Sequence, residues 1–210
     1  MALDCTIIIP HKPTIHNDRA LELNLHALLK HTKVQYELII DTTTPANPYG
    51  IWMRAAQTAH AETLVFTNSD VIMGPGWDVL VRHVEPNTIV TGYIIEPGNI
   101  GVADVNIQLD FGKMPKTFQS FDFDRWVLKR LGFIGNGNEV KIERGWYMPS
   151  AMNRAWFLST PGFDLDYPFP NPADIRFWEY CIKEYGTQLL RVPSYSYHFQ
   201  NLSNTEKYPE

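Results

Sequence analysis

The sequence predicts an α/β fold in which a mostly parallel central sheet is flanked by helices. Over the first ninety-odd residues, short apolar runs alternate with amphipathic segments, which is the order of strand–helix–strand units. The runs Thr6–Pro10, Glu37–Asp41 and Thr63–Thr67 are short and largely apolar, as expected of strands buried on both faces. Right-handed crossovers between them would bring their carboxyl ends to one edge of the sheet, where ligands of such folds bind.

Helices and one further strand are expected between and after these runs. A helix opens near Asn17 or Asp18, where a side chain can cap it, and it carries leucines on one face. A second helix covers about Tyr49–His60 and a short one Trp77–His83, before a fourth strand at Thr88–Ile95.

The second half of the chain is less regular. Pro97–Lys116 is expected to be rich in loops, and Phe121–Leu131 to be helical with Asp122 and Asp124 on solvated faces. The remaining expected elements are a short helix at Arg154–Ser159, a helix at Ile175–Tyr185 that ends at Gly186, and strand segments at Leu189–Val192 and Tyr195–His198. We expect one domain over residues 1–210, which could itself belong to a longer chain with further domains.

Composition and charge exclude several classes of function. The 210-residue chain has a net charge of −5 and a pI of about 5.8, and no Lys/Arg cluster is longer than two residues. A nucleic-acid partner is therefore not expected, although a nucleotide is compatible with this charge. No stretch approaches the ~18 apolar residues of a membrane span, and the amino terminus lacks the basic region of a signal peptide. Cys5 and Cys181 are expected to be buried and reduced, as in a cytoplasmic protein.

The tripeptide Asn68–Ser69–Asp70 follows the third predicted strand and is the first candidate for a chemical site. A carboxylate at the carboxyl end of a strand, beside the turn that begins at Gly74, can hold a hard divalent cation close to phosphate groups. Aspartate is also common at strand ends as a turn former, so the tripeptide alone leaves both interpretations open.

Several short motifs stand in a specific order around this tripeptide. They are a strand ending at Pro10, a strand ending at Asp41, Met53–Arg54, Asn68–Asp70 with Gly76–Trp77 behind it, Pro161–Asp164, Asp174 at a helix start, Gly186–Pro193 and Tyr197–His198. This order, over roughly residues 6–201, resembles that of family-2 glycosyltransferases with the GT-A fold. The resemblance implies an enzyme that moves a sugar from a UDP-activated donor to a hydroxyl of a glycan or glycoprotein acceptor.

The resemblance implies a metal site built by Asp70 and His198. Asp70 matches the last acid of the family's D-x-D motif, and His198 matches its late histidine. Together with two phosphate oxygens these side chains suit Mn²⁺ well and Mg²⁺ tolerably. Asn68 departs from the family, because an acid usually stands at its position, and the cation is left with fewer protein ligands. A packed strand-end histidine is the alternative interpretation of His198.

A site for the nucleotide sugar is implied in the same way. Asp41, Thr43 and Arg54 match positions that hold the uridine and its phosphates, although a loop-capping carboxylate and a surface arginine would look the same. The other residues expected to line this site are Pro10, His11, Lys12, Asn68, Ser69 and, as a platform for the sugar or the acceptor, Trp146. Strand aromatics are also common in cores. On this view residues 1–95 bind the nucleotide sugar and residues 96–210 serve the acceptor and catalysis.

Asp174 matches the catalytic base of the family. A single base that draws the proton from the acceptor hydroxyl, opposite a metal-bound leaving diphosphate, gives direct displacement with inversion at the sugar. The family usually has two acids at this point, whereas Ala173 precedes Asp174 here. A helix N-cap is the other interpretation of Asp174, and Asp164 and Asp166 are the alternative bases.

Two other functions fit parts of the sequence. A sugar nucleotidyltransferase uses a related sheet, but His11–His16 lacks the glycine-rich loop typical of that class. A dehydrogenase is not supported, because no G-x-G-x-x-G follows a strand. A non-catalytic domain that binds carbohydrate or nucleotide sugar would keep the fold, and Asn68 together with the single Asp174 leaves this alternative open.

The resemblance extends to enzymes that glycosylate viral capsid proteins, which implies the host cytoplasm as the location.

Overall fold

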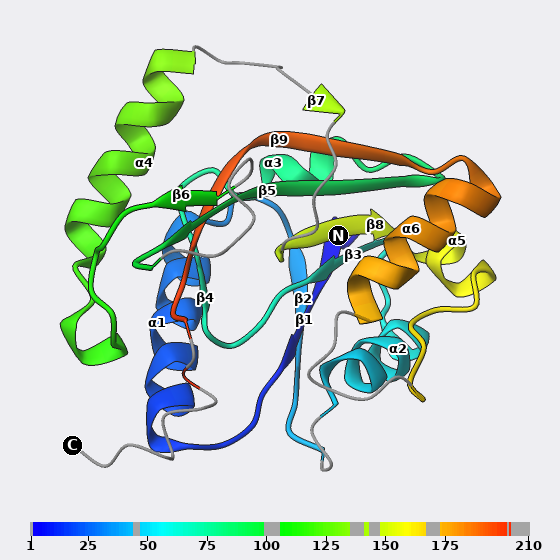
Figure 1. Ribbon diagram of the computed structural model, residues 1–210, viewed down its shortest axis with the longest axis horizontal. Helices are drawn as coiled ribbons and strands as arrows, with labels where there is room; N and C mark the ends of the chain where they lie inside the picture. Colours follow the sequence, from blue (N-terminus) through cyan, green and yellow to red (C-terminus); the bar gives the residue numbers. More distant parts are fainter. Residues whose placement is uncertain are drawn as a thin grey trace.

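One mixed sheet forms the centre of the protein (Figure 1). The computed structural model describes residues 2–43, 47–98, 106–134, 141–142, 148–166, 173–200 and 202. Within these ranges the strand order is β2 (Tyr36–Asp41), β1 (Cys5–Pro10), β3 (Thr63–Phe66), β8 (Ser150–Asn153), β5 (Thr88–Glu96), β9 (Gln188–His198) and β4 (Val71–Met73). Two shorter strands lie off this path: β6 (Asn106–Gln108) pairs with β5, and β7 (Lys141–Ile142) pairs with β9.

Helices cover both faces of the sheet. They are α1 (Ile15–His31), α2 (Pro48–Thr58), α3 (Val79–Arg82), the 3₁₀ helix η1 (Pro115–Thr117), α4 (Ser120–Ile134), α5 (Arg154–Ser159) and α6 (Ala173–Tyr185). In the view of Figure 1, α1 and α4 group at one end of the sheet and α2, α5 and α6 at the other. Along β1, Ile8 packs with the cluster under α2 and α6, while Ile7 and Ile9 pack with the cluster under α1. The alternation explains why this strand is apolar at consecutive positions.

The predicted α/β class is confirmed, and its first strands pair as expected. β1 is parallel to both β2 and β3. Further along, β8 runs antiparallel to β3 and β5, and β9 is parallel to β5 but antiparallel to β4. The sheet is therefore mixed, because the second half of the chain contributes strands to its interior rather than extending one parallel edge.

A cluster of aromatic rings around Phe163 ties α2 to α6. Phe163 is 2% exposed, and its ring centroid lies 4.8 Å from that of Phe177 on α6 and 5.7 Å from that of Trp52 on α2. Gly162 precedes it with a φ of 71°, and a Cβ there would lie 2.8 Å from Met53 Cε. The positive φ favours glycine at this position, whereas the flexible end of Met53 could move aside, and the turn places Phe163 between the two helices.

Truncation of this ring is expected to destabilise the protein strongly. Phe163→Ala removes a buried aromatic side chain that touches both helices, and such changes cost about 3–5 kcal/mol. Urea unfolding followed by circular dichroism measures the loss. Leu165→Ala, at a site that is 46% exposed two residues away, serves as the control and is expected to change stability by less than about 1 kcal/mol. Equal losses in the two variants would contradict the role of the aromatic cluster.

Cys5 and Cys181 are both buried and free, as expected from the sequence. Burial raises the pKa of each thiol to about 12, so both are protonated at neutral pH and unreactive. None of the helices in the described ranges combines the length and the hydropathy that crossing a bilayer requires.

Candidate functional site

A cleft of about 220 Å³ lies where β1 and β3 end, and it gathers most of the predicted site residues. Its lining consists of Pro10, His11, Lys12, Asn17, Pro48, Tyr49, Trp52, Asn68, Ser69, Asp70, Met148 and Asp174. Seven of these residues were expected at the site from the sequence. The cleft therefore brings the ends of two strands together with the first turns of α2 and α6.

The exit of β1 is held in place by the first turn of α1. Asn17 Nδ2 donates to the carbonyl of Lys12 at 3.0 Å, and Thr14 caps the helix by accepting from Asn17 N at 3.1 Å. His11 Nε2 lies 2.8 Å from Asp18 Oδ1. These contacts fix the backbone of residues 11 and 12 at the wall of the cleft. The helix begins at Ile15, slightly earlier than the sequence suggested, because Thr14 rather than Asn17 or Asp18 is its cap.

The turn that carries Asp70 is anchored from two sides. Val71 N donates to Asn68 O at 3.2 Å, which closes the turn, and Asn24 Nδ2 on α1 donates to the same carbonyl at 3.4 Å. Asn24 is fully buried. On the other side, Phe199 N donates to Asp70 O at 3.1 Å. Asp70 is thus held by backbone contacts at both ends and presents its carboxylate to the cleft.

His198 lies between two carboxylates, Asp70 and Glu96. Its Nε2 is 3.6 Å from Asp70 Oδ2, and its Nδ1 is 2.5 Å from Glu96 Oε1. Burial lowers the pKa of His198, but the charge of Asp70 and the hydrogen bonds with Asp70 and Glu96 outweigh it and raise the pKa to about 10. Two flanking carboxylates thus favour a positive charge between them, which either a proton or a bound cation can supply.

The donor set of Asp70 and His198 fits a divalent cation shared with a phosphate-bearing ligand. A separation of 3.6 Å between Nε2 and Oδ2 suits two ligands that each lie about 2.1 Å from a common ion. No group of three or more His, Cys, Asp and Glu side chains arranged to hold a metal occurs among the described residues. A cation at this pair would therefore need oxygens from the ligand or from water to complete its coordination.

Asp174 lies on the α6 side of the cleft and is held by α2. It occupies the first turn of α6, and its Oδ1 accepts a hydrogen bond of 3.2 Å from Tyr49 Oη. Burial raises the pKa of Asp174, and the hydrogen bonds from the Ile175 backbone and from Tyr49 offset this only in part. A carboxylate whose pKa is raised accepts a proton more readily once it is ionised, as a general base must.

Asp41 and Arg54 do not line this cleft. They line a second hollow of about 390 Å³ on the other side of the β1 exit, together with Thr42. Asp41 Oδ2 is 3.4 Å from Arg54 Nη2, and Asp41 Oδ1 accepts from Thr43 N at 2.7 Å. Burial raises the pKa of Asp41, but the bonds with Thr43 and the charge of Arg54 outweigh it, and the net shift is downward.

The cleft and this second hollow lie beside the ends of two neighbouring strands, β1 and β2. Pro10 pairs with Asp41 in the β1–β2 register, and His11 N donates to Asp41 O at 2.9 Å. Asp41, Thr43 and Arg54 are thus next to the cleft but do not line it. Trp146 lies outside the described residues. Asp164, an alternative base, lies with Arg176 in a separate hollow, and the exposed Asp166 lines neither hollow.

Six residues were not assigned to the site from the sequence: Asn17, Pro48, Tyr49, Trp52 and Met148 line the cleft, and Glu96 contacts His198. Glu96 ends an apolar strand and is followed by Pro97–Gly98, which is the same strand-end signal that drew attention to Asp70. Tyr49 lies in the first turn of α2, just after its cap Asn47. For Trp52 and Met148 no signal separates a cleft wall from an ordinary core residue.

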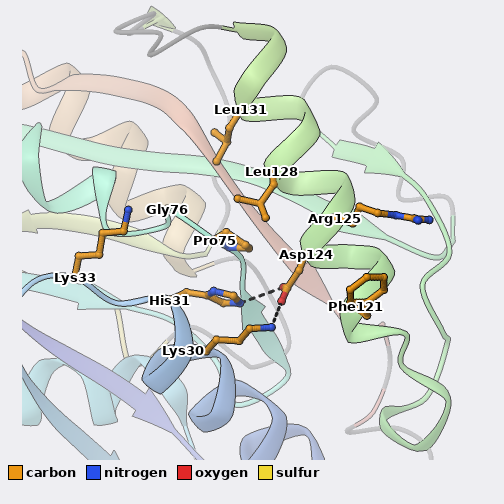
Figure 2. Close-up of a pocket in the computed structure, with 10 residues that line it drawn as sticks. All are labelled: Lys30, His31, Lys33, Pro75, Gly76, Phe121, Asp124, Arg125, Leu128 and Leu131. Atoms are coloured by element: carbon orange, nitrogen blue, oxygen red, sulfur yellow. Dashed lines mark hydrogen bonds and ion pairs between the residues drawn. The ribbon is translucent and has the colours of Figure 1, made fainter.

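A larger hollow, of about 580 Å³, lies between the end of α1 and α4 and holds none of the predicted site residues (Figure 2). The expectation that Asp124 lies on a solvated face is wrong. It is 9% exposed and faces α1, where Lys30 Nζ lies 2.6 Å from its Oδ2 and His31 Nε2 lies 3.1 Å from its Oδ1. Asp124 therefore forms an ion pair with Lys30 and also contacts the imidazole of His31, whose pKa is lowered by burial.

Solved structures with the same arrangement identify the fold. The chain superposes on GalNAc-T7, solved with UDP, GalNAc and Mn²⁺, with a TM-score of 0.59 at 14% sequence identity over 92% of its length. It superposes on residues 1–349 of TarS from S. aureus with a TM-score of 0.57 at 12% identity over 96% of its length. Both are glycosyltransferases of the GT-A class. The chain has the GT-A fold.

The likeness is one of fold alone. The chain spans 43% of the GalNAc-T7 chain and 61% of the TarS chain. A nucleotidyl transferase from Methanothermobacter gives a TM-score of 0.47 at 10% identity, covering 90% of this chain and 86% of that one, which is too low to support an argument. No family model matches the sequence, and no curated protein matches it.

Proposed function

We propose that this GT-A domain is a metal-dependent, inverting glycosyltransferase that moves a sugar from a UDP-activated donor to a hydroxyl of a glycan or glycoprotein. The observation that carries the proposal is that Asp70, beside His198, and Asp174 face one cleft at the strand ends. Following the resemblance of the sequence, a viral capsid glycoprotein is the acceptor to test first.

The residues of the cleft divide the chemistry between them. Asp70 and His198 would hold Mn²⁺ or Mg²⁺, which supplies a Lewis acid that offsets the charge of the leaving diphosphate. Asp174 accepts the proton of the attacking hydroxyl at its carboxylate, and Tyr49 holds that carboxylate in place. A single base on the side opposite the leaving group gives inversion without a covalent intermediate.

The nucleotide is assigned to the β1 side of the cleft. Pro10, His11 and Lys12 form one wall, and Asn68 and Ser69 another. Asp41 and Arg54, with Thr43 bonded to Asp41, would extend the site into the adjoining hollow. The solved structure of GalNAc-T7 with UDP and Mn²⁺ supports the choice of nucleotide and metal.

A non-catalytic domain that binds nucleotide sugar is the second candidate. Asn68 in place of an acid and the single carboxylate Asp174 favour it, because both reduce the catalytic groups of the site. Slow release of UDP from a UDP-sugar in water would distinguish the two, since an enzyme hydrolyses its donor and a binding domain does not.

UDP is expected to stabilise the protein, and Mn²⁺ to strengthen the effect. A ligand at a hundred times its dissociation constant adds about 2.7 kcal/mol to the free energy of unfolding. Thermal unfolding with UDP, GDP and CDP, each with and without Mn²⁺, measures the effect. A larger shift with GDP or CDP would contradict the nucleotide assignment, and the absence of any nucleotide shift would contradict the proposed function.

A further inference from the structure

The register of three strands places Glu96 and His198 side by side. β5 and β9 are parallel, with Ile95 opposite Tyr197, and Glu96 is the last residue of β5. On the other side of β9, His198 pairs with Val71 of β4, the residue after Asp70. The sheet itself therefore lines up Glu96, His198 and Asp70 across neighbouring strands.

The contacts of His198 give its two ring nitrogens different surroundings. Nδ1 lies 2.5 Å from Glu96 Oε1, so it carries a hydrogen that the carboxylate accepts. Nε2 points the other way and lies 3.6 Å from Oδ2 of Asp70, which lines the cleft. Since an imidazole can bind a metal only through an unprotonated nitrogen, the partner of Nδ1 decides whether Nε2 is the free one.

The buried carboxylate of Glu96 has a high free-energy cost for a residue with a purely structural role. It is 2% exposed, and a buried carboxylate costs free energy unless a cation or strong donors compensate it. It is not among the described residues that line the cleft. Its carboxylate is instead directed to the one nitrogen of His198 that faces away from Asp70.

From this arrangement we infer that Glu96 is a positioning residue, which holds Nδ1–H of His198 so that Nε2 faces the cation site at Asp70. The inference rests on the proposed function, because it assumes a cation at Asp70 and His198. Partners of this kind fix the orientation of a ligating histidine, and their loss weakens metal binding by about 10–100-fold.

The test measures metal binding rather than catalysis. The dissociation constant of Mn²⁺ is determined in the presence of saturating UDP from the electron paramagnetic resonance signal of free Mn²⁺. Glu96→Leu, which cannot accept a hydrogen bond, is expected to raise this constant about 10–100-fold. Glu96→Gln keeps the size and an acceptor oxygen, so it is expected to retain more affinity than Glu96→Leu.

A second buried carboxylate–imidazole pair offers a matched control. Asp124 contacts His31 at 3.1 Å and lines the hollow of Figure 2, which shares no residue with the cleft. Asp124→Leu removes the same kind of contact and is expected to leave Mn²⁺ binding unchanged. Mn²⁺ binding weakened equally by Asp124→Leu and Glu96→Leu would show a general loss of structure and overturn the inference.

Nuclear magnetic resonance of the histidine ring adds a second measurement, which a change in packing alone would not alter. With UDP and diamagnetic Mg²⁺, the His198 ring of the wild type is expected to carry its hydrogen on Nδ1, and Glu96→Gln is expected to reduce that preference. If Glu96→Leu does not fold, this measurement on Glu96→Gln still tests the role of Glu96. Wild-type affinity and an unchanged tautomer in Glu96→Gln would overturn the role of Glu96 alone, whereas the absence of Mn²⁺ binding by the wild type would contradict the proposed function itself.

Discussion

Asp174→Asn is expected to lower the rate of sugar transfer about 10²–10⁴-fold, which is the usual contribution of a general base. The substitution keeps the size of the side chain and still accepts the hydrogen bond from Tyr49 that holds Asp174 at 3.2 Å. It removes the ability to take a proton from the acceptor hydroxyl. Affinity for UDP and Mn²⁺ is expected to be unchanged, because Asp174 lies on the α6 side of the cleft.

Asp164→Asn is the matched control for this change. Asp164 is exposed and accepts from Asp166 N at 3.2 Å, outside the cleft lining. Transfer is measured as UDP released in the presence of acceptor, with binding measured separately by calorimetry. Near-normal transfer by Asp174→Asn, with a large loss in Asp164→Asn, would move the base to the loop after α5 and contradict the proposed assignment.

Asp70→Ala is expected to abolish the effect of Mn²⁺ on UDP binding. Asp70 lines the cleft and lies beside His198, so its loss would leave His198 as the single proposed protein ligand for the ion. The free energy of unfolding is expected to change by less than about 1 kcal/mol, since the turn is held by backbone contacts. Calorimetric titration of UDP at several Mn²⁺ concentrations measures the coupling between the two ligands.

Asp110→Ala controls for the loss of a turn carboxylate as such. Asp110 is exposed and accepts from Gly112 N at 2.8 Å, in a loop that does not line the cleft. Its replacement is expected to leave the Mn²⁺ dependence intact. An undiminished Mn²⁺ response in Asp70→Ala would mean that Asp70 only shapes the turn.

The elements that the sequence predicted correctly are those with a sustained pattern. The six residues of β1 are all buried, and the Ile-rich run shows this directly. β4 and β8 were missed because three and four residues are too few to show a period. Both owe their strand conformation to pairing with partners more than sixty residues away, which no local pattern reveals.

The sequence predicted two separate strand segments where the structure has the single strand β9. Pro193, which lies between the two predicted segments, explains the difference. Proline cannot donate to the ladder, so a strand accommodates it at an irregularity. The register between β5 and β9 shifts between Thr91 and Tyr93. A Cβ at Gly92 would lie 2.6 Å from Ser194 O, so only glycine allows the backbone of β9 to bulge toward β5 there. The strand continues through this bulge to His198.

Seven of the residues that the order of motifs singled out line one cleft, but the order did not predict how they contact one another. Asp70 and His198 come together because β9 lies beside β4, an antiparallel pairing across more than a hundred residues. The partner of His198, Glu96, depends on the same long-range register. Asp41 and Arg54 were expected at the nucleotide, and they lie in the neighbouring hollow because α2 packs against β2 on the far side of the β1 exit.

Among the described strands, β9 is the last to be synthesised, yet it lies between β5 and β4 within the sheet. A nascent chain that has not reached residue 188 leaves an edge of β5 and an edge of β4 without their partner, and unpaired edges invite association with other chains. The imidazole of His198 arrives at the very end of this strand. The proposed cation site at Asp70 and His198 therefore cannot form before residue 198 has been synthesised, and the strand that joins β5 to β4 would also complete that site.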